Sequence, residues 1–164
     1  MTSPTSIRSG IGFDVHKFAE GRKLILGGVK IDYPQGLAGH SDADVVCHAI
    51  ADALLGAAGM GDIGMMFPDT DPANKDISSL KILEDICTKL TAKSFVINNI
   101  DISIITEKPK ISDYSDQMKT VIAKSLKIDI DQINIKGKTT ETLGFTGRKE
   151  GIAALAIATI YTKS

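Results

Sequence analysis

Hydrophobic and polar residues alternate over residues 7–17, and this period of two predicts a β-strand with two unlike faces. Ile11, Phe13 and Val15 share one face, whereas Gly12, Asp14 and His16 share the other. The polar face is the one on which functional side chains are expected.

The rest of the chain divides into segments of either strand or helix period. Gly27-Gly28 separates two apolar triplets and predicts a hairpin over residues 24–31, after which residues 33–36 break the sheet. Ser41, with Asp44 three residues later, is typical of a capping box and predicts a helix to about Leu55, ended by Gly56 and Gly59. The other predicted elements are a helix from Ser79, a strand over 95–106, a helix over about 113–126, a strand around Ile133 and Ile135, and a buried strand over 151–162.

Strands separated by helices, together with one hairpin, predict an α+β fold, an α/β two-layer sandwich. We expect a mixed four-stranded sheet plus the hairpin, with the helices on one face. Residues 59–75 are too irregular for an element and too long for a simple connector, so they are expected to form a functional loop. With no repeat or linker, residues 1–164 are expected to form one domain, with residues 1–6 flexible.

Composition excludes several classes of function. The 164 residues carry 19 Lys and Arg against 20 Asp and Glu, which disfavours a nucleic-acid or membrane-surface binder. The first residues lack the apolar stretch of a secretory signal, and no apolar run approaches the length of a membrane span, so a cytoplasmic location is expected. Cys47 and Cys87 form no CxxC motif and lie in apolar helical patterns, which favours buried free thiols.

The charges are distributed unevenly along the chain. Residues 31–74 contain seven Asp and no Lys or Arg, a bias that favours metal ions or exposure to water. The three histidines, His16, His40 and His48, all lie within the first 48 residues. This clustering makes a metal site near the first strand more credible.

The strongest candidate chemistry combines the first strand with the first helix. Asp14 and His16 are two residues apart on a strand, so both can reach one ion, although such a pair alone is more often a surface pair. His48 shares a helical stripe with Asp44 and Asp52, which predicts a polar rather than a core environment. Two imidazoles and one carboxylate suit Zn²⁺ with an open fourth position, as in catalytic zinc sites.

Three further segments carry candidate chemistry, and each also has a purely structural interpretation. His40-Ser41 precedes a predicted helix, where free N–H groups attract phosphate, but Ser41 could simply cap that helix. Residues 62–64 and 67–71 could be turns only, although their density of Asp and Gly favours function. Residues 136–148 place hydroxyls, a carboxylate and cations together, as in a phosphate and divalent-metal site. The structural alternative for this segment is a helix cap followed by a solvated turn.

Five motifs occur in order: GFDVHxF at 12–18, GHSDADVVxH at 39–48, DALLGAA at 52–58, GDIGxxFPDTD at 61–71 and TTExLGFTGR at 139–148. Together they closely resemble the 2-C-methyl-D-erythritol 2,4-cyclodiphosphate synthase family, from about Gly10 to the last strand. The resemblance implies an enzyme of the non-mevalonate isoprenoid pathway. In its reaction the 2-phosphate of 4-diphosphocytidyl-2-C-methyl-D-erythritol 2-phosphate attacks the β-phosphorus and expels CMP.

The resemblance also implies roles for individual residues. Asp14, His16 and His48 match the ligands of a zinc ion that polarises the β-phosphate. His40 and Thr139 match the positions that stabilise the transition state. Glu141 matches the ligand of a second divalent ion, Mg²⁺ or Mn²⁺, between the α- and β-phosphates.

Substrate-binding positions follow from the same resemblance. Those near the metal and the methylerythritol phosphate are Asp14, Val15, His16, His40, Ser41, Asp62, Ile63, Gly64, Phe67, Pro68, Asp69, Thr70 and Asp71. Those near the cytidine and the diphosphate are Thr106, Glu107, Lys108, Pro109, Lys110, Ile111, Ser112, Lys138, Thr139, Thr140 and Glu141. Family members are homotrimers with active sites between subunits, and Phe13, Phe145 and Arg148 match residues lining a central cavity that can hold isoprenoid diphosphates.

Two positions depart from the family pattern, and two other functions stay open. Lys138 replaces a small or hydroxylated residue and Glu107 replaces Gln, which puts the nucleotide contacts in question. One alternative is a non-catalytic trimer that binds isoprenoid diphosphates around a structural zinc, which His40, Asp62 and Thr139 argue against. The other is a metal-dependent phosphohydrolase, for which residues 39–71 offer no obvious base to activate water.

Overall fold

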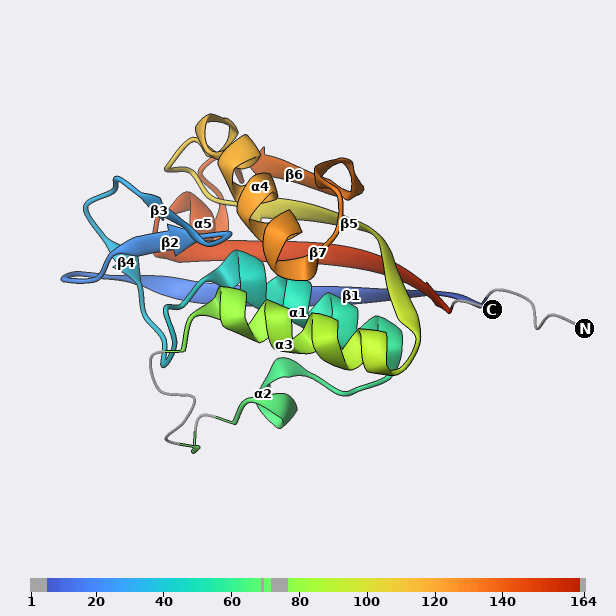
Figure 1. The fold of residues 1–164 in the computed structure, drawn as a ribbon. Helices are drawn as coiled ribbons and strands as arrows, with labels where there is room; N and C mark the ends of the chain where they lie inside the picture. The colour runs from blue at the N-terminus through green and yellow to red at the C-terminus, as the bar shows by residue number, and fades with distance from the viewer. Residues whose placement is uncertain (1–5, 69, 72–76, 163–164) are drawn as a thin grey trace, which may run out of the picture.

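A mixed five-stranded sheet of order β4-β1-β7-β5-β6 forms one layer of the molecule (Figure 1). The computed structural model describes residues 6–68, 70–71 and 77–162. The strands of the large sheet are β1 (Ile7–Ala19), β4 (Gly36–Leu37), β5 (Phe95–Ile105), β6 (Ile133–Lys138) and β7 (Gly151–Thr162). The hairpin strands β2 (Leu24–Leu26) and β3 (Val29–Ile31) pair with each other in a second, small sheet.

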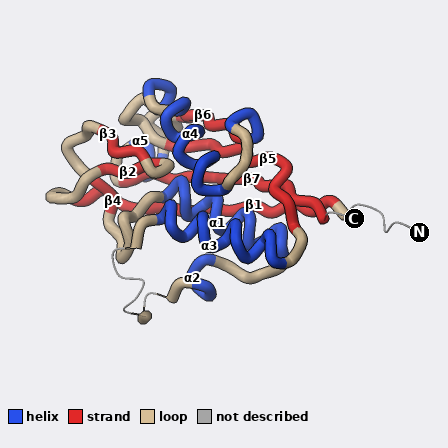
Figure 2. The backbone as a smooth tube through the Cα atoms, in the orientation of Figure 1, coloured by secondary structure: helices blue, strands red, loops and turns tan. Residues whose placement is uncertain are grey.

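Three helices cover one face of the large sheet (Figure 2): α1 (Val45–Ala58), α3 (Ser79–Ala92) and α4 (Ser115–Leu126). The shorter helical segments are α2 (Ile63–Met66), α5 (Gly144–Gly147) and the 3₁₀ turns η2 (Ile111–Asp113) and η3 (Ile130–Gln132). Within the described residues no helix is both long enough and apolar enough to span a bilayer. The mixed sheet with helices on one face confirms the predicted two-layer α+β architecture.

The sheet has one strand more than the four predicted. Gly36 and Leu37, part of which was expected to break the sheet, pair antiparallel with Ala19 and Phe18 as strand β4. Leu37 is almost fully buried, and burial of its side chain stabilises this two-residue strand at the edge of the sheet. Two residues are too few to show an alternating pattern, so sequence periodicity missed the strand.

Helix α1 begins later and ends later than predicted. Its N-cap is Asp44 rather than Ser41, because the Asp44 carboxylate accepts hydrogen bonds from the N–H groups of Val46 and Cys47. The helix continues through Gly56 to Ala58, and Gly59 ends it with a φ of 67°. A short helix, α2, also forms inside the segment expected to be an irregular loop.

Asp44 does not belong to the polar stripe of His48 that the sequence suggested. It is fully buried, and its two carboxylate oxygens also accept hydrogen bonds from the N–H groups of Gly27 and Gly28. Burial raises the pKa of Asp44 even though these backbone donors act to lower it. Asp44 therefore ties the hairpin turn to the start of α1 and is a structural residue.

Helix α1 packs on β1 with almost no space between the two backbones. A Cβ atom placed on Gly10 would lie 2.1 Å from the carbonyl oxygen of Ala53, and one placed on Gly12 would lie 1.9 Å from that of Ala49. Glycine is therefore required at both strand positions for this approach. The close packing sets the distance between the polar face of β1 and the side chains of α1.

On the other face of the large sheet, the part formed by β1 and β7 is apolar and exposed. It carries Ile11 and Phe13 of β1, which are 65% and 56% exposed, and their cross-strand neighbours on β7, Ile157 and Leu155. Contiguous exposed apolar surface of this kind usually marks an interface.

Both cysteines, Cys47 and Cys87, are buried free thiols, as predicted.

Candidate functional site

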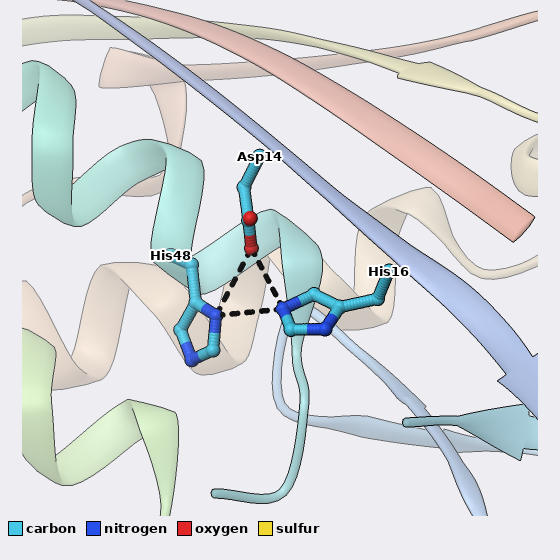
Figure 3. Close-up of side chains that lie close together, drawn as sticks. All are labelled: Asp14, His16 and His48. Atoms are coloured by element: carbon cyan, nitrogen blue, oxygen red, sulfur yellow. Dashed lines mark hydrogen bonds and ion pairs between the residues drawn. The ribbon is translucent and has the colours of Figure 1, made fainter. Parts of the chain in front are cut away.

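Three side chains from β1 and α1 converge on one point (Figure 3). Asp14 Oδ2 lies 2.9 Å from His16 Nε2 and 3.0 Å from His48 Nδ1, and the two ring nitrogens are 3.2 Å apart. All three residues are partly buried. The structure therefore brings together the three residues that the sequence predicted as metal ligands.

The proton positions around His16 favour a cation at this point. His16 Nδ1 lies 2.6 Å from the carbonyl oxygen of Ala38, which can only accept, so Nδ1 carries a proton. In the neutral ring Nε2 then presents a lone pair to the Asp14 carboxylate, which is also an acceptor. Acceptor atoms that face one another without a proton repel, and a metal ion relieves this repulsion.

The spacing of the three ligand atoms fits a small tetrahedral ion. Zinc with bonds of about 2.0–2.1 Å separates its ligand atoms by roughly 3.3 Å. The three separations in this cluster, 2.9, 3.0 and 3.2 Å, are close to that value. The donor set and its spacing therefore fit zinc with one position left for another ligand.

In the metal-free protein, a proton on His16 relieves the repulsion between His16 and the Asp14 carboxylate. Burial alone would raise the pKa of Asp14, but the hydrogen bond from His16 and the charges of His16 and His48 hold this pKa well below its usual value. Burial alone would lower the pKa of His16, but the bond to Asp14 raises it. The metal-free pair thus favours an ionised carboxylate beside a protonated imidazole.

We expect the stabilisation that zinc confers to increase with pH. The raised pKa of His16 stabilises the metal-free fold fully below the ordinary value of 6.5, and this contribution is lost as pH rises through the folded-state pKa. The lowered pKa of Asp14 stabilises the fold at pH values above the ordinary pKa of 3.8, and this stabilisation is lost only in acid. Zinc must displace the His16 proton and therefore competes best at high pH.

Thermal unfolding with and without zinc, from about pH 5.5 to about pH 8, measures this effect across the ordinary titration range of histidine. The zinc-induced rise in Tm should be larger at the upper end of the range. A rise that is larger at the acidic end would contradict the assignment of His16 as a ligand.

A cavity of about 230 Å³ opens beside the three ligands. It is lined by Asp14, His16, Gly39, His40, Ser41, His48, Ile63, Gly64, Phe67, Ile77 and Ile82. Most of the predicted residues of the first two motifs and of the α2 region therefore line one space, whereas Val15 and Asp62 are not among its lining residues. Their common cavity favours function over the alternative that they form only caps and turns.

The loop that carries His40 and Ser41 is held by Arg22. The Arg22 guanidinium donates to the carbonyl oxygens of Gly39, at 3.1 Å, and Ser41, at 2.7 Å. Ser41 Oγ accepts a hydrogen bond from the N–H group of Ala43 and lies 3.2 Å from His48 Nε2. Ser41 thus stabilises the turn before α1 while its hydroxyl faces the cavity, and the expectation that it caps the helix is wrong because Asp44 is the N-cap.

Helix α2 carries the third group of predicted residues. Asp62 caps α2 by accepting a hydrogen bond from the N–H group of Met65, and Asp52 of α1 accepts one from Ile63. Burial raises the pKa of Asp52. Of the following predicted residues, Pro68, Thr70 and Asp71 are exposed and Asp69 lies outside the described residues.

The remaining predicted residues form a second cluster where β5 and β6 end. These strands are parallel, so their carboxyl ends bring residues 106–112 beside residues 137–139 around a cavity of about 370 Å³. Its lining residues are Thr106, Glu107, Lys108, Pro109, Lys110, Ile111, Ser112, Gly137, Lys138 and Thr139. The side chain of Ile111 is buried, so Ile111 can offer a ligand mainly its backbone.

Glu107 organises the loop that follows β6. Its Oε1 accepts hydrogen bonds from the N–H groups of Thr140 and Thr142 and from the Thr140 hydroxyl. Thr139 donates its hydroxyl to Glu141 Oε1 at 2.6 Å. The loop therefore presents the Thr139 hydroxyl and the Glu141 carboxylate together, as a phosphate and metal site requires.

Within one chain the two cavities share no lining residue. Phe13 and Phe145 are exposed, and Arg148 is paired with Glu150 at 2.7 Å. A single chain thus supplies both kinds of cluster without joining them into one cavity.

Sequence reasoning missed two groups that position the site. Arg22 is a single cation in a turn, and no pattern distinguishes it. Asp42 and Asp52 lie in the motifs and Ser79 begins α3, but the roles of all three depend on contacts between distant elements. Asp42 and Ser79, for example, are 37 residues apart and bonded to each other.

Comparison with known proteins agrees with these observations. A family model described as the YgbB family matches residues 7–161. A protein of Caldicellulosiruptor bescii named 2-C-methyl-D-erythritol 2,4-cyclodiphosphate synthase is 58% identical over 92% of this chain and 96% of its own length. One of the same name from Bacillus velezensis is 55% identical over 93% of this chain and 97% of its own length.

Solved structures show the same fold. A structure titled IspF (Plasmodium falciparum) CDP complex matches with a TM-score of 0.86 at 38% identity, over 99% of this chain and 100% of that one. The bifunctional IspDF of Campylobacter jejuni matches with a TM-score of 0.93 at 44% identity. That alignment covers 98% of this chain, which spans only 43% of the bifunctional chain.

Proposed function

Because this chain belongs to the YgbB family, we propose that it performs the cyclisation of its named relatives with the Asp14, His16 and His48 cluster as a zinc centre. The activity is that of 2-C-methyl-D-erythritol 2,4-cyclodiphosphate synthase, a lyase of the non-mevalonate pathway to isoprenoids. The convergence of three acceptor atoms at 2.9–3.2 Å is the observation that carries the zinc centre. A cytoplasmic location stays a prediction.

The residues of the first cavity hold and orient the reacting phosphates. When bound, zinc supplies a Lewis acid for the β-phosphate of the substrate. His40 and Ser41 lie beside the three ligands and offer an imidazole and a hydroxyl to phosphate oxygens. Arg22 fixes their loop through two backbone carbonyls, so these donors are positioned before substrate arrives.

The loop after β6 provides a second place for phosphate and metal. Thr139 and Glu141 are hydrogen-bonded to each other, and we propose that they separate to bind phosphate and a Mg²⁺ or Mn²⁺ ion respectively. The substrate's own 2-phosphate is the nucleophile, so the protein needs to supply positioning and charge neutralisation rather than a covalent group. Asp62 near the first cavity is proposed to bind the erythritol hydroxyls.

We propose that the cavity at the ends of β5 and β6 binds cytidine. A Plasmodium falciparum relative of the same fold has been solved as a CDP complex. Backbone groups of residues 106–112 and the exposed ammonium group of Lys110 line this space and suit a nucleotide.

We also propose that Phe13, Phe145 and Arg148 line a central cavity of the trimer that can hold isoprenoid diphosphates.

A homotrimer would unite the two clusters. Each chain has one metal-facing and one nucleotide-facing cavity, and its apolar β1–β7 face, defined by Ile11, Phe13, Leu155 and Ile157, needs cover. A symmetric interface could bury this face and place one chain's nucleotide cavity beside its neighbour's metal centre. The active sites would then lie between subunits.

We expect Ile11→Glu to prevent trimer formation. Ile11 is 65% exposed and lies opposite Ile157 on the β1–β7 face, so a carboxylate there would be buried in the interface without a partner. Sedimentation or light scattering should give the mass of one chain instead of three. Ile130→Glu is the matched control, because Ile130 is 48% exposed on η3, away from that face, and should leave the trimer intact. An unchanged trimer of Ile11→Glu would reject this interface.

Phosphorus NMR of the protein with the diphosphocytidyl substrate, Zn²⁺ and Mg²⁺ tests the whole proposal. Release of CMP with a cyclic diphosphate supports the cyclase. Release of CMP with linear phosphates would instead show a phosphohydrolase, and no turnover would leave a binding protein. Removal of zinc by chelation should abolish turnover, and its return should restore it.

A further inference from the structure

Ser79, the first residue of α3, reaches across to the metal centre. It is fully buried, and its Oγ lies 2.9 Å from Nε2 of His48. This contact is on the opposite side of the imidazole from Nδ1, the atom that faces Asp14 and His16. Ser79 was expected only to begin a helix, and neither the proposed catalysis nor the proposed substrate contacts require it.

Asp42 controls the proton of the Ser79 hydroxyl. The hydroxyl donates to Asp42 Oδ1, and the N–H group of Ser79 donates to Asp42 Oδ2 at 3.0 Å. Both oxygens of the carboxylate are thus engaged by one residue. Because a hydroxyl has a single proton, Ser79 can meet His48 only as an acceptor.

The direction of these bonds fixes the state of the His48 ring. If Ser79 Oγ accepts, His48 Nε2 must carry the proton, and in the neutral ring Nδ1 then presents its lone pair to Asp14 and His16. Ser41 also approaches Nε2, but at 3.2 Å and with a hydroxyl that no carboxylate orients. Ser79 is therefore the better-placed acceptor.

We propose that Asp42 and Ser79 act as a positioning pair that holds His48 with Nε2 protonated and Nδ1 available as a metal ligand. The inference rests on the proposed zinc centre and assigns the pair no contact with substrate. The Asp42 carboxylate makes Ser79 a stronger acceptor, which in turn makes His48 a stronger donor to the metal. Helix α3 thereby contributes to the metal centre without providing a ligand.

Zinc affinity of the full-length protein, measured by competition with a chelating dye, tests the role. Ser79→Ala should weaken zinc binding by roughly 10–100-fold, the usual effect of removing such a partner. Asp42→Asn should also weaken it, because the NH₂ group that replaces one carboxylate oxygen cannot accept a hydrogen bond from Ser79. Thr88→Ala is the matched control, since the Thr88 hydroxyl is exposed on the same helix and bonds only to the Glu84 carbonyl.

Nitrogen-15 NMR of the metal-free wild type, at about pH 8 where an ordinary imidazole is neutral, tests the proton position without any substitution. His48 should show a protonated Nε2, and Ser79→Ala should show a mixture of tautomers. A protonated Nδ1 in the wild type would overturn the proposal even if Ser79→Ala fails to fold.

The outcomes separate this inference from the zinc centre itself. Equal zinc affinity of wild type and Ser79→Ala would reject the positioning role and leave the zinc centre in place. Failure of the wild type to bind zinc would reject both. A tenfold or greater loss in Ser79→Ala, with Thr88→Ala unchanged, supports the pair.

Discussion

His48→Ala should lose stoichiometric zinc and reduce turnover by at least about 100-fold, because removal of one ligand leaves only Asp14 and His16 to hold the ion. The fold should survive, since His48 is only partly buried and the core side chains of α1, such as Ile50, Leu54 and Leu55, are unchanged. Metal analysis after dialysis, an activity assay and circular dichroism measure the three effects separately.

His40→Ala provides the matched control for this experiment. His40 lines the same cavity but is absent from the ligand cluster, so its replacement should lower turnover and leave the zinc content unchanged. Together the two variants distinguish a ligand from a group that acts on substrate. Full zinc content in His48→Ala would rule out the ligand assignment.

Gly12→Ala should destabilise the protein by more than about 3 kcal/mol, at or beyond the upper end of ordinary overpacking. The new methyl group would lie 1.9 Å from the carbonyl oxygen of Ala49 and 2.7 Å from the nitrogen of Ala53, and neither backbone atom can move without the helix. Strand and helix must therefore separate, which also draws Asp14 away from His48. Denaturant unfolding and zinc affinity should both be reduced.

Gly56→Ala is the contrasting substitution on the same helix. A Cβ atom there would meet only the carbonyl oxygen of Ile11, at 3.9 Å, so the methyl group has room. Replacing a glycine inside a helix should stabilise the protein by about 0.5–1 kcal/mol. If Gly12→Ala were tolerated as well as Gly56→Ala, the close contact between β1 and α1 could not be what sets the ligand geometry.

Periodicity predicted most of the fold, and residue spacing indicated the three residues of the proposed metal centre. The alternating pattern around Asp14 and His16 placed both on one face of β1, because strand geometry alone decides this direction. Helical spacing predicted only a polar environment for His48. The sequence also indicated the cluster at the ends of β5 and β6 through its resemblance to a known family. These are features in which chain neighbours share one function.

Contacts between distant segments were not predictable in the same way. Asp44 was expected on the polar stripe of α1, but its carboxylate turns inward to four N–H groups, two of them on the hairpin. Asp42 and Asp44 belong to one short motif and have separate roles, which their spacing does not reveal. Strand β4 and the bonds from Arg22 to the loop of His40 and Ser41 likewise depend on contacts between segments that are distant in the sequence.

The close seat of α1 on β1 has a consequence for how the enzyme matures. The three ligands stand on two elements joined by a glycine-on-alanine contact, so the backbone brings them together without help from a metal. We therefore predict that synthesis and metal loading are separate events, in which the chain folds first and acquires its ion afterwards. A cell short of zinc would then hold a reserve of folded, inactive enzyme that becomes active as soon as the ion returns.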